Sequence, residues 1–285
     1  MHTVVRPLPP AARYGAALLR AEWGLLAALA ALLALALWGP ALASSPHQHD
    51  FADQRTWWGL PCALDVLSNL PFAVAGVAGL VWLRRLGALR LCRATRATAG
   101  VFFGGLLLTA LGSTVYHWQP SDAGLLWDRL GMAVAFAGLL GWAVVGRISP
   151  RAGVAVTLGV LAGGPAAVAV WAHTGNLLPW AVVQMGGMAV VLVLAWQPHR
   201  HGALALPLGA VIAWYVAAKV LEGADHAVFE ATGHWVSGHT LKHLAAACAA
   251  WPLLRAMARL HHSRYAARPW ATARMQNGGH RAGCA

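Results

Sequence analysis

The sequence is poor in charged residues, and above all in acidic ones. Charged side chains make up 11% of its 285 residues and nine residues are Asp or Glu, whereas 59% are hydrophobic. A soluble domain of this size needs far more charge to cover its surface. Apolar stretches of about 20 residues recur along the chain, and a helix of that length crosses the hydrocarbon core of a bilayer. The composition therefore excludes a soluble domain and predicts an all-α polytopic membrane protein.

Cysteine is also scarce. The four cysteines, Cys62, Cys92, Cys248 and Cys284, have none of the paired spacings that mark metal sites. Most of them lie in predicted helices or beside basic segments, where we expect no disulfide framework. Neither a cysteine-based metal site nor a disulfide scaffold is predicted.

The basic residues are distributed in a way that indicates a membrane and not a nucleic-acid partner. A net charge of +12 alone would suit either. Most of the 21 Lys and Arg residues fall in the N-terminal tail, in 84–96, in the turns at 147–151 and 200, and in 255–281. Loops rich in Lys and Arg stay on the cytoplasmic side of a membrane. With these segments inside, every acidic residue except Glu22 falls on the outer side, so we expect no nucleic-acid partner.

Hydropathy predicts eight membrane-spanning helices. They cover about residues 23–43, 61–83, 97–117, 123–145, 152–172, 178–196, 204–221 and 238–258. The chain then divides into a basic cytoplasmic tail (1–21), an N-terminal segment (22–43), a transmembrane bundle (44–260) and a second basic cytoplasmic tail (261–285). The N-terminal segment is either an extra transmembrane helix or a signal sequence, because Ala41-Leu42-Ala43-Ser44 resembles a signal-peptidase site. The long leader before it favours a retained helix.

Polar residues occur near the outer ends of three of these predicted helices. Ser113 and His117 are four residues apart and therefore share one helix face, and Asp128 lies about one turn inside the next helix. His239 and His243 have the same spacing at the start of the last helix. The predicted topology brings all three helix ends to a similar depth, so we expect the five side chains to form one site.

These five residues have the chemistry of a hydrolytic metal centre. Neutral imidazole is a good zinc ligand, and we expect His117, His239 and His243 to hold Zn²⁺. Three histidines leave one coordination position for a water, whose pKa zinc lowers to about 7. Asp128 is the expected proton carrier, and Ser113 is the expected hydrogen-bond donor to the oxyanion. The set fits hydrolysis of an amide or ester presented from the lipid.

Simpler interpretations exist for the polar residues of this chain. A His or Ser in a membrane helix often only bonds a neighbouring helix, and paired histidines occur by chance in a chain with 14 of them. Asp65, Ser68 and Asn69 form a second polar group, whose simplest role is also helix–helix hydrogen bonding. Asp50 and Asp53 could instead join Asp65 around a second, hard cation such as calcium, which prefers several oxygen ligands.

Three motifs contain most of these residues. They are Asp65-Val-Leu-Ser68-Asn69-Leu-Pro-Phe72, then Gly112-Ser113-Thr-Val-Tyr-His117 with Asp128 following, and His239-Thr-Leu-Lys-His243. Together they resemble the alkaline ceramidase family of the CREST superfamily of membrane hydrolases. The segments 51–55 and 237–243 are similar to bacterial members specifically. The resemblance covers about residues 47–250.

The resemblance implies a seven-helix bundle, here preceded by one extra helix. It also implies zinc on His117, His239 and His243, with Asp128 and Ser113 beside the reacting carbonyl. Family members cleave the amide of ceramides. The expected function is therefore zinc-dependent amide hydrolysis of a ceramide-like membrane lipid in a bacterial inner membrane, with the site on the periplasmic side.

Calcium is not expected as a cofactor. The animal and yeast members carry a calcium loop, Asp-Trp-Cys-Glu-x-Asn, and a Glu at the position of Cys62. Both features are missing from this sequence.

Two other functions compete with the amidase. A lipid-binding receptor of the related progestin and adipoQ receptor type would use the same site to bind a lipid. An electron carrier with a bis-histidine haem would leave Ser113 and Asp128 without a purpose, and the chain has no CxxCH motif.

Overall fold

The computed structural model describes residues 18–262, and the regular secondary structure of this part is helical. Most of both predicted basic tails lies outside the described residues. The helices are α1 (Arg20–Trp38), α2 (Ala63–Leu67), α3 (Leu70–Arg90), α4 (Arg93–Trp118), α5 (Asp122–Arg147), α6 (Pro150–Thr174), α7 (Leu178–Ala181), the π-helical turn η1 (Val182–Gly186), α8 (Gly187–Ala195), α9 (Leu208–Gly223), α10 (Asp225–Ala231), α11 (Gly238–Cys248) and α12 (Trp251–His262).

Six of the predicted spans are confirmed as helices long and apolar enough to cross a membrane. Within the described residues these are Arg20–Trp38, Ala63–Ala88, Arg93–Trp118, Asp122–Arg147, Pro150–Thr174 and Leu178–Ala195. Large apolar side chains on their surfaces, such as Leu37, Val74 and Leu111, are exposed. A soluble protein rarely exposes so much continuous apolar surface, whereas a lipid-facing surface requires it. The chain is a multi-pass integral membrane protein.

The last two predicted spans form helices that are shorter than these six. Helix α9 has 16 residues. The predicted eighth helix is divided into α11 and α12 next to Pro252. Proline lacks a backbone N–H and its ring crowds the preceding turn, so an uninterrupted helix is disfavoured there.

The predicted arginine-rich loop at 84–96 is wrong, because most of it is helical. Helix α3 continues to Arg90 and α4 begins at Arg93. The Cys92 side chain accepts a hydrogen bond from the Thr95 backbone N–H and caps α4. Arginine is tolerated at helix ends because its long stem carries the guanidinium to the headgroups. The hydrophobic stretch of the sequence therefore marks the part of a helix in the hydrocarbon core, and the helix itself can extend beyond it.

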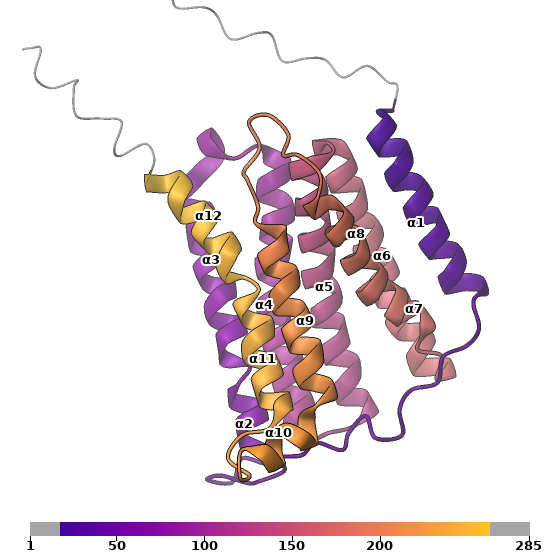
Figure 1. The fold of residues 1–285 in the computed structure, drawn as a ribbon, viewed down its shortest axis with the longest axis vertical. Helices are drawn as coiled ribbons and strands as arrows, with labels where there is room; N and C mark the ends of the chain where they lie inside the picture. Colours follow the sequence, from indigo (N-terminus) through magenta and orange to yellow (C-terminus); the bar gives the residue numbers. More distant parts are fainter. Residues whose placement is uncertain (1–17, 263–285) are drawn as a thin grey trace, which may run out of the picture.

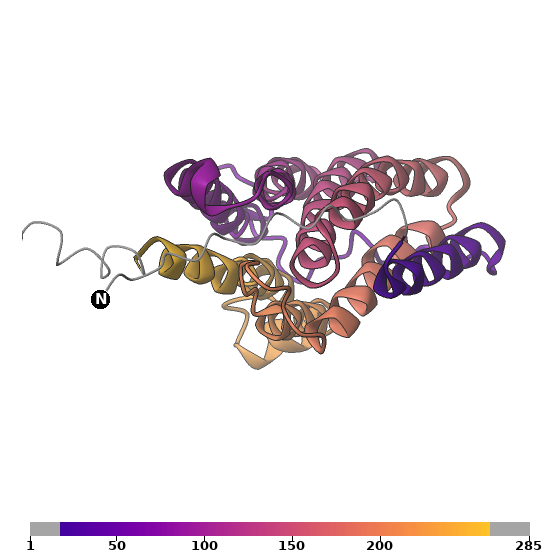
Figure 2. The same ribbon diagram turned by 90° about the horizontal axis from the view of Figure 1, so that it is seen from above.

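The helices form two rows, seen end-on in Figure 2. Helices α3, α4, α5 and α6 follow one another in the first row, and α8, α9 and α11 make the second. Contacts of α3 with α11 and α12, and of α5 with α8, join the rows. Helix α1 lies at one edge of the bundle, beside α7 and η1 (Figure 1).

Helices α4 and α5 pack closely against each other, and two glycines make the approach possible. A Cβ atom on Gly112 would overlap the Trp127 backbone, and one on Gly131 would overlap the backbone of Leu108 and Thr109. Small residues let membrane helices approach closely where larger side chains would hold them apart. This packing sets Ser113, near the end of α4, against Asp128 of α5.

Helix α1 is attached to the bundle at both of its ends. Near its start, buried Glu22 accepts hydrogen bonds from Ser149 Oγ at 2.5 Å and from Arg151 Nε at 2.8 Å. After its end, the Leu177 N–H donates to the Leu42 carbonyl at 2.7 Å. Most of α1 between these points is exposed.

Candidate metal centre

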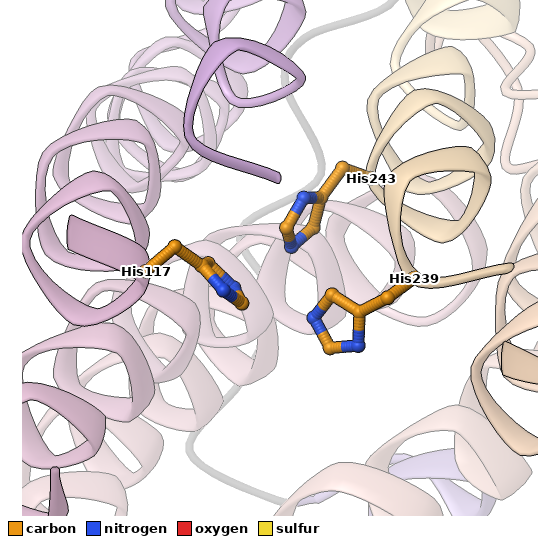
Figure 3. Close-up of side chains that lie close together, drawn as sticks. All are labelled: His117, His239 and His243. Carbon is orange, nitrogen blue, oxygen red and sulfur yellow. The ribbon is translucent and has the colours of Figure 1, made fainter. Parts of the chain in front are cut away.

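The three histidines meet, as predicted, between the two rows of helices. His117 comes from α4, and His239 and His243 come from α11; their rings point toward one another (Figure 3). Each histidine offers one ring nitrogen, and these three nitrogens lie within 4.8 Å of one another. All three side chains are buried. Among the described residues, this is the one group of His, Cys, Asp and Glu side chains close enough to hold a single ion.

Helix ends place these histidines. The Ser237 hydroxyl accepts a hydrogen bond from the Thr240 N–H and caps α11 immediately before His239. The i and i+4 spacing then turns His239 and His243 to the same face. The backbone N–H of His239 donates to Asp225 Oδ1 at 2.7 Å, which fixes the start of the helix.

Ser68 determines which nitrogen of His243 is free. Its hydroxyl donates to the Asp65 carbonyl at 2.9 Å and lies 2.7 Å from His243 Nδ1. The single hydroxyl proton is used by Asp65, so Nδ1 must be the donor in the second bond. The Nε2 lone pair of His243 is then available to a metal, and the ring is held by the kind of outer hydrogen bond that metal-binding histidines have.

His117 has a buried nitrogen without a hydrogen-bond partner. Its Nδ1 is buried and unpaired, although buried polar atoms are nearly always satisfied. The ring centroids of His239 and His243 lie 4.8 and 4.9 Å away from that of His117. A buried imidazole with an unpaired nitrogen, packed beside two further imidazoles, fits a metal-ligand set.

Lys242 lies in contact with the histidines, and the sequence motif did not identify it. Its Nζ is 3.0 Å from His239 Nε2 and 3.0 Å from Glu222 Oε1. An ammonium group can only donate, so it uses the His239 lone pair. An ion that binds at this nitrogen must replace the lysine, which keeps its second partner on Glu222.

Ser113 and Asp128 lie in the wall of a cavity of about 130 Å³ beside the histidines. His243 and Lys242 complete the polar end of this cavity. The Ser113 hydroxyl interacts with the Asp128 carboxylate. The remaining lining is apolar and includes Phe72, Phe102, Leu106, Phe136, Leu139 and Met188. The cavity thus joins a polar end at the histidines to an apolar interior.

A segment between α1 and α2 covers the histidines from the outer side; we call residues 44–54 the outer belt. The Phe51 ring lies 4.6 Å from the ring centroids of both His117 and His239. His49 Nδ1 lies 2.9 Å from Tyr116 Oη, and the Ala52 N–H donates to Asp225 at 3.0 Å. The belt thus places an aromatic ring directly over two of the three histidines.

The three carboxylates considered for a second cation have separate partners. Asp53 binds Arg55 through two hydrogen bonds of 2.7 Å, and this pairing raises the pKa of the Arg55 guanidinium. Asp65 accepts from Thr240 Oγ1 at 2.6 Å. Asp50 lies beside His47, at 3.7 Å. Asp53 and Asp65 stabilise the belt and the α11 start.

Phe51, Ser68 and Lys242 are the site residues that sequence reasoning missed. Ser68 was predicted to form a helix–helix hydrogen bond, and its partner in that bond is His243, a candidate metal ligand. A signal for Lys242 existed, because a charged residue in a membrane helix is costly and usually functional. Phe51 belongs to the segment 51–55, which carries part of the resemblance, but the position of its ring depends on the path of an irregular segment and could not be predicted.

Comparisons with known proteins do not assign the chain to a family. No model of a protein family matches it, and no characterised protein matches it. The chain is a polytopic all-α membrane protein with a buried three-histidine cluster.

Proposed function

We propose that this protein is a zinc-dependent membrane hydrolase that cleaves the amide bond of an N-acyl lipid of the ceramide type. The observation that carries the proposal is the position of the histidine cluster. Through His243 it borders the polar end of an apolar cavity whose wall also holds Ser113 and Asp128. A polar end with proton-transfer groups and an apolar interior fits the head and tail of an acyl lipid.

The donor set suits zinc. Three neutral imidazoles are a common protein ligand set for catalytic zinc, and His117, His239 and His243 would be these ligands. Bound zinc would lower the pKa of a coordinated water to about 7 and polarise the lipid carbonyl. The unpaired Nδ1 of buried His117 and the hydrogen bond from His243 to Ser68 support a ligand role for both rings.

Asp128 is the proton carrier in this proposal. In the hydrolysis, the hydroxyl of a water adds to the acyl carbon and the carbon–nitrogen bond breaks. Asp128 accepts the water proton and gives it to the departing nitrogen, so that the products are a fatty acid and an amine. The Ser113 hydroxyl donates its one proton to the ionised Asp128 carboxylate; once Asp128 holds the water proton, the hydroxyl is free to donate to the carbonyl oxygen in the same wall.

The apolar part of the cavity is the proposed acyl-chain site. It runs from the histidines between α4 and α5 of one row and α8, α9 and α11 of the other. The outer belt closes the site toward the outer phase through Phe51. We propose that the substrate enters from the membrane, where lipids are already present.

The proposed location is a bacterial inner membrane with the site near its outer, periplasmic surface. In this arrangement α9 and the broken helix α11–α12 complete eight crossings. The support is the separation of charge along the bundle: the arginines of 84–96 and of the α5–α6 turn lie at the ends opposite to the histidines. Basic segments favour the cytoplasmic side.

Hydrolysis is tested with purified zinc-loaded protein and a panel of N-acyl lipids that includes ceramides. We expect chelator-sensitive release of fatty acid, followed by mass spectrometry. Asp128→Asn should retain zinc and lose nearly all turnover, because proton transfer typically contributes about 100-fold to 10,000-fold in rate.

The opposite outcome would favour a receptor. If zinc-loaded protein binds N-acyl lipids and cleaves none of them, or if Asp128→Asn is as fast as the unchanged protein, the amidase proposal is wrong. The same site would then bind a lipid signal.

A further inference from the structure

The central cavity has a positively charged side chain at its polar end. Lys242 lines the cavity together with Ser113, Asp128 and His243. Most basic residues of the described range 18–262 lie toward the opposite ends of the helices, so this lysine needs an explanation. A cation in a membrane cavity is costly unless something pairs with it.

The charge of Lys242 is only partly balanced by its protein partner. Glu222 binds Lys242 at 3.0 Å and also binds Lys219. One carboxylate is therefore shared by two ammonium groups. Asp128 also interacts with Lys242 electrostatically, but its charge disappears when it accepts a proton during the reaction proposed above.

Occupation of the histidines would free a donor of Lys242. The ammonium has three N–H donors, and one of them now points to His239 Nε2. An ion at this nitrogen takes the lone pair, so the donor must find another acceptor. The cavity is the space that Lys242 already lines.

We infer that Lys242 forms a carboxylate subsite at the polar end of the cavity, and that the preferred substrates are N-acyl amino acids. That these lipids are cleaved rests on the proposed function, whereas the binding of their carboxylate by Lys242 does not depend on it. The apolar cavity takes the acyl chain, which leaves the amine half of the lipid with Asp128 and Lys242. An amine product without an acidic group would be a cation beside Lys242 and would be repelled, whereas an amino acid has a carboxylate to pair with it.

The reaction with such a substrate is balanced. Water supplies a hydroxyl to the acyl carbon and a proton to the nitrogen, and the carbon–nitrogen bond breaks. The products are a fatty acid and a free amino acid. The amino acid carboxylate keeps its pairing with Lys242 throughout and takes part in no bond change.

A binding experiment tests the subsite without turnover. Zinc-loaded Asp128→Asn protein is titrated with N-dodecanoylglycine and with its neutral, equally large analogue N-dodecanoylglycinamide. We expect the acid to bind about tenfold more tightly, as a charge-assisted hydrogen bond would give. In this background Lys242→Met should remove the difference, and Lys242→Arg should restore it. Lys219→Met is the matched control, since Lys219 binds the same Glu222 but does not line the cavity.

The outcomes separate the two proposals. Equal binding of acid and amide, or a preference that survives in Lys242→Met with its zinc content unchanged, overturns the subsite. Turnover of both lipids by the unchanged protein is measured in parallel. Preferential binding of the acid without any cleavage supports the subsite and contradicts the hydrolase. Cleavage of ceramide and the neutral amide with no preference for the acid supports the hydrolase and contradicts the subsite.

Discussion

A single hydroxyl decides the geometry of one ligand candidate. Ser68 directly follows the short helix α2, and it contacts His243 of α11 at 2.7 Å. With its proton donated to the Asp65 carbonyl, the hydroxyl can only accept from His243 Nδ1. One serine therefore selects both the tautomer and the orientation of the ring.

Ser68→Ala should weaken zinc binding by about 10-fold to 100-fold, because outer hydrogen bonds to ligating histidines have effects of this size. Affinity is measured by competition with a chromophoric chelator. Thr98→Val is the matched control, since its buried hydroxyl bonds only within α4. If Ser68→Ala and Thr98→Val bind zinc equally well, the serine does not orient a ligand.

Ser113→Ala tests the second hydroxyl of the site. If Ser113 donates to the carbonyl oxygen during attack, its loss should raise the barrier by about 2–4 kcal/mol and leave the zinc content unchanged. The check is kcat/KM for the best N-acyl substrate together with the metal content of the same sample. A normal rate in zinc-replete Ser113→Ala protein would remove the serine from the mechanism.

The element that matters most for access is the outer belt. Phe51 is 5% exposed, although it belongs to an irregular segment in the connection between α1 and α2. Its ring contacts His117 and His239, and the neighbouring His49 and Ala52 are bonded to α4 and α10. The belt is thus positioned to exclude water from the histidines.

Phe51→Ala should make zinc about tenfold easier to remove with a chelator, since the apolar shell around a metal site controls solvent access. The release rate of zinc is followed after the chelator is added. Trp58→Ala is the control, because Trp58 is 96% exposed. Equal release rates in the two variants would show that the belt is not a barrier.

Helix patterns predicted much of this arrangement, for reasons visible in individual residues. The i and i+4 spacing of His239 and His243 survives any change in tertiary packing, so their shared face was predictable. Their meeting with His117 followed from topology, because helix ends on one side of a membrane share a depth. The helix break beside Pro252 and the helical structure within 84–96 were not predicted. Hydropathy identifies apolar segments but does not predict where the backbone hydrogen bonds of a helix end.

The contacts of Phe51 and Lys242 could not be predicted in the same way. The belt has no period, so nothing in the sequence places Phe51 over the histidines. Lys242 lies between the two histidines of its motif, and its partner Glu222 comes from α9. Only the packing of α9 against α11 decides which way this lysine turns.

At the scale of the whole molecule, charge sets the orientation. Most arginines of residues 18–262 gather at the helix ends opposite to the histidines, and the acidic residues, with the exception of Glu22, gather toward the histidine end. Glu22 lies at the basic end but is buried in a pair with Arg151, so it does not offset the surface charge. Under the positive-inside rule, this distribution supports the proposed orientation, in which the histidines lie toward the outer side.

Reporter fusions test this orientation. A reporter that is active only in the cytoplasm should be active after residue 285 and inactive when inserted in the segment 44–60. A reporter active only after export should give the reverse pattern. Export of the C-terminal fusion would mean that the bundle is inserted the other way round and that the site faces the cytoplasm.

The central claim is that His117, His239 and His243 hold one metal ion. Its most direct test is the metal content of protein purified without chelators, measured by elemental mass spectrometry. The unchanged protein is compared with the double variant His239→Ala/His243→Ala. We expect about one zinc per chain in the unchanged protein and almost none in the double variant, because a single remaining histidine cannot hold the ion. Zinc at full occupancy in the double variant, or a metal-free unchanged protein after zinc loading, would contradict the claim.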